Sequence, residues 1–130
     1  MVCHRREFLA ALAALPQQKP KRQPRPPDLQ IARIASTRQE GRIAYEGDLK
    51  VTGERPLNGL ILQFEFFESR RVLLSMQKIE VESGTLMPGE ERHFNVQGAD
   101  VPRAVSFRLS GSETNGRELS VAGGGPHPLD

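Results

Sequence analysis

The sequence contains very little cysteine and few aromatic residues. Its 130 residues include one Cys, one Tyr, six Phe and no Trp. The single thiol, Cys3, lies in a segment that we interpret below as a removable export signal. The mature chain would then have no disulfide, thiolate metal cluster or cysteine nucleophile, and its stability must come from a packed core. The few aromatic side chains also provide little surface for stacking on bases or sugars.

Positive charge is scarce in the body of the chain, although the whole sequence has a formal net charge of +2. Six Lys and Arg residues precede residue 28. Residues 28–130 contain 12 Lys or Arg against 15 Asp or Glu, which leaves a net charge of −3. A nucleic-acid-binding domain carries its cationic side chains on the fold itself. We therefore expect no nucleic-acid partner.

Long hydrophobic runs are absent as well. The longest run covers residues 8–15, whereas a helix needs about 20 apolar residues to cross a bilayer. This run follows a short charged start and precedes Pro16, and Ala11 and Ala13 form the small-x-small pattern of a cleavage site. We predict a signal peptide over residues 1–16 and no stable membrane span.

Paired arginines precede the apolar run. Arg5 and Arg6, one spacer residue, and then Phe8 and Leu9 resemble the twin-arginine motif, although the flanking His and Ala depart from it. The resemblance implies export by the twin-arginine translocase to the periplasm or the outside. Two alternatives are a Sec signal with an incidental Arg pair and an amphipathic N-terminal helix, which the prolines from residue 16 onward would separate from the domain.

Residues 17–27 are rich in Pro, Lys and Arg and contain no other apolar side chain. Such a segment cannot bury surface, so we predict an extended linker. It either exposes the cleavage site as a spacer or acts as a cationic tether attracted to an anionic membrane surface.

Residues 28–122 alternate apolar and polar side chains with a period of two, and no helical period persists over three turns. Turn signals such as Asn58-Gly59, Pro88-Gly89 and residues 98–100 separate the runs. We predict an all-β domain, a small antiparallel β-sandwich of seven to eight strands, followed by a frayed, flexible tail at residues 123–130. The expected strands lie at residues 29–35, 43–51, 60–66, 72–76, 79–81, 92–96, 104–109 and 118–121.

The apolar side chains of one strand face should form the core, because two sheets must pair their dry faces. The expected core consists of Ile43, Tyr45, Leu49, Val51, Leu60, Leu62, Phe64, Phe66, Leu74, Phe94, Val96, Val105, Phe107 and Leu109. Leu86 should also pack inward beside a tight turn at Pro88-Gly89. Gly47, inside a strand, indicates a bulge or a close approach of the backbone.

Four segments between residues 44 and 96 occur in a recognisable order. A strand containing Gly47 precedes a Pro-containing turn at residues 55–60, the run Phe64-Glu65-Phe66-Phe67-Glu68, and a Leu-Met-Pro-Gly-Glu segment at residues 86–90. This order resembles the FxLYD-type domains of exported bacterial proteins, with Phe, Phe and Glu replacing the Leu, Tyr and Asp of the naming motif. The resemblance implies an Ig-like sandwich that serves as a scaffold or interaction module, and it supplies no functional residues.

No catalytic constellation is visible in the mature sequence. His93 alternates with a core residue and should face solvent, and His127 lies in the tail. Glu80 and Glu82 share one strand face, where a solvated charged surface is the ordinary arrangement. The serines lack a neighbouring His or a nucleophile elbow. We therefore predict no enzyme activity, no metal and no cofactor.

Three apolar residues fall on the second, outward face of their strands: Ile61, Phe67 and Leu73. If they line up across neighbouring strands they form an exposed partner surface, unless the C-terminal strand or the linker covers them. We predict an exported, non-enzymatic Ig-like module of the bacterial envelope that binds a protein partner or acts as a scaffold. The alternative is a ligand- or metal-binding accessory protein of an exported redox system.

Overall fold

The computed structural model describes residues 25–129, which form nine strands and no helix. The predicted signal peptide, with Arg5, Arg6, Phe8, Leu9, Ala11 and Ala13, lies outside the described residues, as does most of the linker. The strands are β1 (Leu29–Gln39), β2 (Arg42–Val51), β3 (Leu57–Phe67), β4 (Leu73–Leu86), β5 (Glu91–Ala99), β6 (Ser106–Ser112), β7 (Glu118–Leu119), β8 (Val121–Ala122) and β9 (His127–Pro128).

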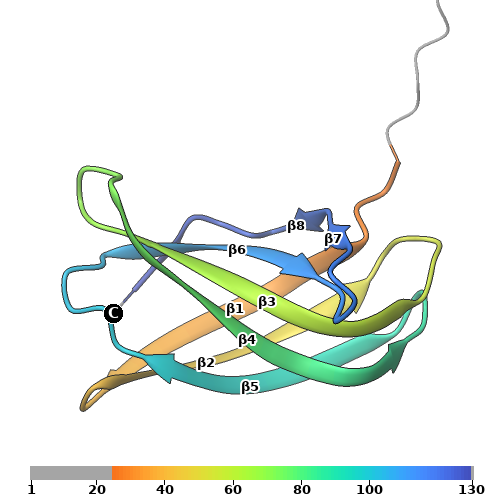
Figure 1. The fold of residues 1–130 in the computed structure, drawn as a ribbon, viewed down its shortest axis with the longest axis horizontal. Helices are drawn as coiled ribbons and strands as arrows, with labels where there is room; N and C mark the ends of the chain where they lie inside the picture. Colours follow the sequence, from red (N-terminus) through yellow and green to blue (C-terminus); the bar gives the residue numbers. More distant parts are fainter. Residues whose placement is uncertain (1–24, 130) are drawn as a thin grey trace, which may run out of the picture.

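The strands form two sheets that face each other, which confirms the predicted all-β sandwich, with nine strands where the sequence predicted seven to eight (Figure 1). One sheet has the order β5-β2-β1-β8 and the other β4-β3-β6-β7, with β9 pairing on β6. All pairings are antiparallel except that of β1 with β8. The described chain enters at one end of the sandwich, and the β3–β4 turn lies at the opposite end (Figure 1).

Aromatic rings from both sheets fill the space between them. The ring centroid of Tyr45, on β2, lies 4.3 Å from that of Phe64 on β3 and 5.5 Å from that of Phe107 on β6. Phe66 stacks beside Phe64 in the second sheet. Eleven of the fourteen expected core residues are buried, and Leu74 and Val96 are partly buried against the core.

The sequence prediction is wrong for Val105, whose side chain is 47% exposed. Val105 precedes β6, and its N–H donates to the carbonyl of Phe67, so it lies at the rim where strand alternation has not begun. Ala104 is buried in its place. The prediction also omitted five further core residues, namely Leu29, Ile31, Leu57, Ala104 and Leu119.

Strand β4 is longer than the sequence pattern predicts. The two expected short strands, 72–76 and 79–81, are one strand of 14 residues. Gln77 and Lys78, between the two apolar runs, pair with Phe64 and Gln63 of β3. Because β4 is a sheet edge, it does not need an unbroken apolar face.

The expected turn at Asn58-Gly59 lies inside β3 as a register irregularity. Gly59 has a φ of +82°, and a Cβ atom there would lie 2.5 Å from the Thr114 side chain. Gly98 likewise lies inside β5, not in a turn. The Asn58-Gly59 dipeptide is a common turn signal, but here Gly59 is needed because the backbone packs closely against Thr114.

Two other glycine predictions are confirmed. A Cβ atom on Gly47 would lie 2.2 Å from the Arg33 carbonyl oxygen and 2.8 Å from the Phe94 ring, which is the close approach that the sequence indicated. Gly89 adopts a φ of +87° in the tight turn between β4 and β5, where Glu90 N–H donates to the Met87 carbonyl. Leu86 and Phe94, on either side of this turn, are buried.

The prediction of a frayed C-terminal tail is wrong for the described residues. Strand β9 pairs with β6, the Gly124 carbonyl accepts from Leu109 N–H at 2.7 Å, and Leu129 N–H donates to the Val105 carbonyl at 2.9 Å. Strand β7 covers only two residues of β6. The tail satisfies backbone groups along the rest of β6 that would otherwise lie unpaired at a sheet edge.

The turn after β6 is fixed to β3 by a buried carboxylate. Glu113 is 2% exposed and accepts hydrogen bonds from Arg117 Nε at 2.8 Å and from the Asn58 N–H at 2.8 Å. The hydrogen bond from Arg117, followed by that from Asn58, holds the pKa of Glu113 below its ordinary range. The Thr114 hydroxyl adds a hydrogen bond to the Asn58 carbonyl.

The first residues of the domain are fixed to its end. The Asp28 N–H donates to the Ser120 hydroxyl, and the Ser120 N–H donates to the Asp28 carboxylate, each at 2.9 Å. This exchange lies where β1 meets β8.

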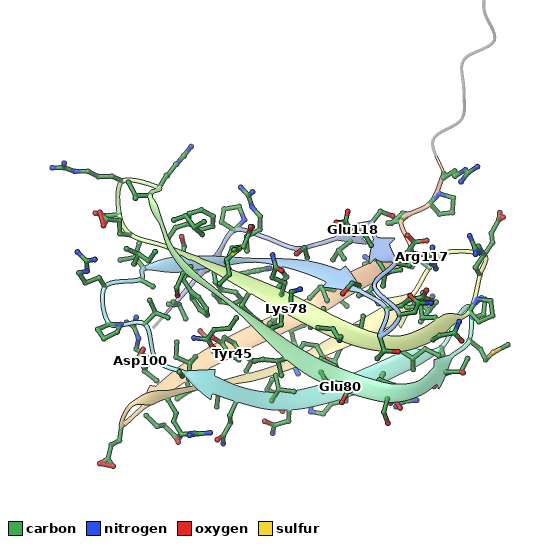
Figure 2. The ribbon with its side chains drawn as sticks, in the orientation of Figure 1. Tyr45, Lys78, Glu80, Asp100, Arg117 and Glu118 are labelled. Carbon is green, nitrogen blue, oxygen red and sulfur yellow. The ribbon has the colours of Figure 1, made fainter. Side chains whose placement is uncertain are left out.

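The Tyr45 hydroxyl is buried without a hydrogen-bond partner among the described residues. Ser36, its partner in the β1–β2 register, also has a buried hydroxyl without a hydrogen-bond partner among these residues. Burial, and then the nearby negative charge of Asp100, raises the pKa of Tyr45 above its ordinary value. Figure 2 shows Tyr45 and Asp100 toward the same end of the sandwich.

We expect Tyr45→Phe to keep the ring contacts and raise the free energy of unfolding by about 1 kcal/mol, because it removes a hydroxyl whose burial is uncompensated. Urea unfolding followed by circular dichroism measures the change. A loss of stability would instead mean that the hydroxyl has a bound partner in solution.

Candidate functional site

Two of the three predicted surface residues lie side by side on the outer face of the second sheet. Phe67, near the end of β3, is directly opposite Leu73, at the start of β4. Leu73 is 45% exposed and Phe67 is partly buried. Met76, opposite Glu65 on the same face, is 55% exposed. We call Phe67, Leu73 and Met76 the Phe67 patch.

Ile61 lies outside this patch. It is opposite Glu80 of β4 and Ser112 of β6, and Gln63 and Glu65 separate it from Phe67 along β3. Figure 2 shows Lys78 and Glu80 on β4, on the stretch beyond Met76. The sequence placed the three residues on one face, but only the strand register shows that polar side chains of β4 and β6 lie beside Ile61.

A groove of about 310 Å³ adjoins the patch. Its lining residues are Phe67, Arg71, Ser106, Arg108 and Pro126. The Arg108 guanidinium lies over the Phe67 ring, 5.5 Å from its centroid, in a cation–π contact. The groove thus has an aromatic wall and two cationic side chains, from the β3–β4 turn and from β6. Sequence reasoning missed both arginines, because they meet Phe67 from segments that are far apart in the chain.

A polar cluster around His93 lies on the outer face of the first sheet, which contains β1, β2 and β5. His93 Nδ1 is 2.9 Å from Asp48 Oδ1, and His93 Nε2 is 3.2 Å from Glu46 Oε2. Arg33 Nε donates to Asp48 Oδ2 at 3.0 Å. These side chains come from β1, β2 and β5 and are about half exposed. The sequence predicted an exposed His93, which is confirmed, but not its neighbours.

The two histidines are each engaged by nearby groups. His127 Nε2 lies 2.8 Å from the Gly123 carbonyl oxygen, while His93 lies between two carboxylates. Within residues 25–129, no group of three or more His, Cys, Asp or Glu side chains has the arrangement of a metal site. Over the same residues, no helix is long and apolar enough to cross a membrane.

Glu80 and Glu82, the carboxylates considered for acid–base chemistry, have different neighbours. Glu82 pairs with Arg92 and accepts a hydrogen bond from the Gly84 N–H at 2.9 Å. The bond from Gly84, and then Arg92, holds the pKa of Glu82 below its ordinary range. Glu80 points along the exposed side of β4 opposite Ile61. A carboxylate bound to arginine and held ionised is poorly suited to act as a general acid near neutral pH.

The cluster around His93 lowers one further pKa. The hydrogen bond from His93, followed by that from Arg33, holds the pKa of Asp48 below its ordinary range. Donors to a carboxylate favour its charged form. The cluster is exposed, so it has little effect on stability.

We expect His93→Ala to raise the pKa of Asp48 toward the ordinary aspartate value. The variant loses the hydrogen bond that lowers this pKa most, while the hydrogen bond from Arg33 remains. NMR titration of the carboxyl carbon checks this. Arg42→Ala, on the same sheet and bonded to Gln97, is the matched control. An unchanged Asp48 titration in the His93 variant would mean that the two side chains do not interact in solution.

No protein-family model matches the sequence, and no curated protein matches it. The resemblance to FxLYD-type domains and to a twin-arginine signal therefore stays a prediction. Solved structures resemble the fold over a minor part of their own length.

A calcium-binding mutant of Bacteroides uniformis β-glucuronidase 2 is similar over 74% of this chain and 14% of its own, at 16% identity and a TM-score of 0.49. Kluyveromyces marxianus β-glucosidase is similar in its selenomethionine-labelled form over 72% of this chain and 13% of its own, at 17% identity and a TM-score of 0.34. Its glucose complex is similar over 79% and 14%, at 16% identity and a TM-score of 0.36. The chain thus spans about one seventh of these enzymes.

Proposed function

We propose that this chain is an exported, non-enzymatic Ig-like module that binds a protein partner through the Phe67 patch. The observation that supports the proposal is the pairing of Phe67 with Leu73 beside the exposed Met76. Val72, which precedes Leu73, is a further 51% exposed. Exposed apolar side chains that gather at one end of a strand pair are typical of interaction surfaces.

The character of β4 also supports a docking surface at this end. The strand begins with Leu73 and Met76 and continues with Lys78, Glu80 and Glu82. Charged side chains on an edge strand oppose unwanted pairing with other chains. This protection covers the middle of β4 and leaves its apolar beginning open, where a partner can bury Leu73 and Met76.

Leu73→Glu should abolish capture of a partner that wild-type protein recovers from envelope extracts, because a charge would be buried in the apolar contact. Met87→Glu is the matched control, since Met87 is 54% exposed and lies at the opposite end of β4. The captured proteins are cross-linked through Lys78 and counted by quantitative mass spectrometry for wild type, Leu73→Glu and Met87→Glu. Equal recovery by wild type and Leu73→Glu would overturn the proposed surface.

The proposed location depends on the leader, and it can be tested separately. Replacing Arg5 and Arg6 together with Lys should stop export by the twin-arginine translocase while leaving the chain folded, since both residues precede the domain. Cell fractionation with immunoblotting measures the exported share. Unchanged export that depends on the Sec machinery would identify a Sec signal, and retention of the wild-type chain inside the cell would overturn the proposal of export.

A further inference from the structure

We propose that the groove beside Phe67 recognises a carboxylate of a protein partner, presented by an acidic residue next to an apolar one. Arg71 and Arg108 would bind the carboxylate, and Phe67 and Pro126 would contact the apolar neighbour. The inference rests on the proposed function, and it names the chemistry of the segment that binds there.

The groove combines the two features that such a segment needs. Phe67 and Pro126 provide apolar walls, and Arg71 and Arg108 bring guanidinium groups from the β3–β4 turn and from β6. Arginine presents paired N–H donors that match the two oxygens of a carboxylate. With Arg108 already placed over the Phe67 ring, its guanidinium plane is partly oriented before a ligand binds.

The backbone of Arg71 is an independent indication that its side chain matters. Among the described residues, Arg71 is the one non-glycine residue with a positive φ, at 63°. Its N–H donates to the Glu68 carbonyl and closes the turn between β3 and β4. Glycine or asparagine adopts this conformation more easily than arginine. Strained backbone residues cluster at binding sites, so the conformation of Arg71 beside the groove supports a role for its side chain in binding.

The two guanidinium groups also lack a carboxylate partner within residues 25–129. The arginines that form ion pairs there are Arg33, Arg38, Arg92 and Arg117. Two acidic residues lie nearby: Glu65 is opposite Arg108 in the strand register, and Glu68 begins the turn that contains Arg71. Neither forms an ion pair with the groove arginines in this part of the chain, so both cations are available to a ligand.

The charge of the domain selects the kind of partner. Residues 28–130 carry a net charge of −3, with 12 basic and 15 acidic residues. The domain without its cationic linker is repelled by an anionic bilayer or a nucleic acid, because these present charge over an area much larger than the groove. A short acidic peptide segment brings its charge to Arg71 and Arg108 alone. Charge complementarity therefore favours a protein segment.

The test is selection from bead-displayed random heptapeptides with the purified chain. We expect enrichment of peptides in which Asp or Glu neighbours a Phe, Tyr or Leu. By fluorescence polarisation, the selected peptide should bind Arg71→Asn at least about tenfold more weakly, since one charge-assisted contact is lost. The melting temperature of Arg71→Asn should be unchanged or higher by up to about 4 °C, because asparagine tolerates positive φ.

A loss of peptide binding without a fall in melting temperature separates an effect on binding from an effect on folding. A merely structural Arg71 would lower binding and melting temperature together. Arg55→Asn, at an exposed site in the β2–β3 connection, is the control and should bind like wild type. The amide version of the selected peptide, with Gln or Asn in place of the acid, should lose binding to the same extent as Arg71→Asn.

Several outcomes would overturn the inference. They are no enrichment, a selected motif without a carboxylate, binding of Arg71→Asn within twofold of wild type, or binding to phosphatidylglycerol vesicles that depends on Arg71 and is tighter than binding to the peptide. If Leu73→Glu still abolishes partner capture in any of these cases, the proposed function stands and only the carboxylate recognition fails. If Leu73→Glu has no effect either, both fail.

Discussion

The packing of one tyrosine ring across the gap between two sheets is the contact on which this fold depends. Tyr45 is the aromatic side chain that β2 sends into the core, and it meets Phe64 and Phe107 of the facing sheet. The described chain contains no cysteine, so no disulfide assists this contact. A sandwich of this size must hold its sheets together by burial of apolar side chains alone.

The remaining elements can be understood as ways to close the edges that this packing leaves. Strands β4 and β5 are the exposed edges of the two sheets on one side, and Arg92 of β5 joins them through Glu82. On the other side, short strands β7, β8 and β9 cover parts of β1 and β6. The C-terminal residues therefore satisfy backbone groups at the sheet edges, and Leu119, Val121 and Leu129 also pack against the core.

The sequence predicted the parts of this fold that follow from alternation. Strands β2, β3 and β6 have one wet face and one dry face, so their core residues Tyr45, Phe64 and Phe107 could be named in advance. The continuity of β4 and the pairing of the tail could not, because both depend on hydrogen bonds to distant strands. Local pattern contains no information on which backbone groups a distant strand leaves unsatisfied.

The candidate site divides in the same way. Phe67 and Leu73 were found from the face on which they lie, and the strand register brought them together. Arg71 and Arg108 were missed, because exposed arginines are common and only the fold places these two beside an aromatic ring. The strained backbone at Arg71 has no sequence signal, since the residue types that usually mark positive φ are absent there.

The direction in which the chain enters the sandwich sets the geometry of any assembly that it forms. The described chain begins beside Leu29, at the end of the sandwich opposite the β3–β4 turn (Figure 1). Strand β3 runs the length between these ends, and its 11 residues span about 35 Å at roughly 3.3 Å per residue. Anything joined to the N-terminal side is thus held about one domain length from a molecule bound at the Phe67 patch. In such an assembly the sandwich would act as a spacer between its N-terminal side and a partner bound at the Phe67 patch.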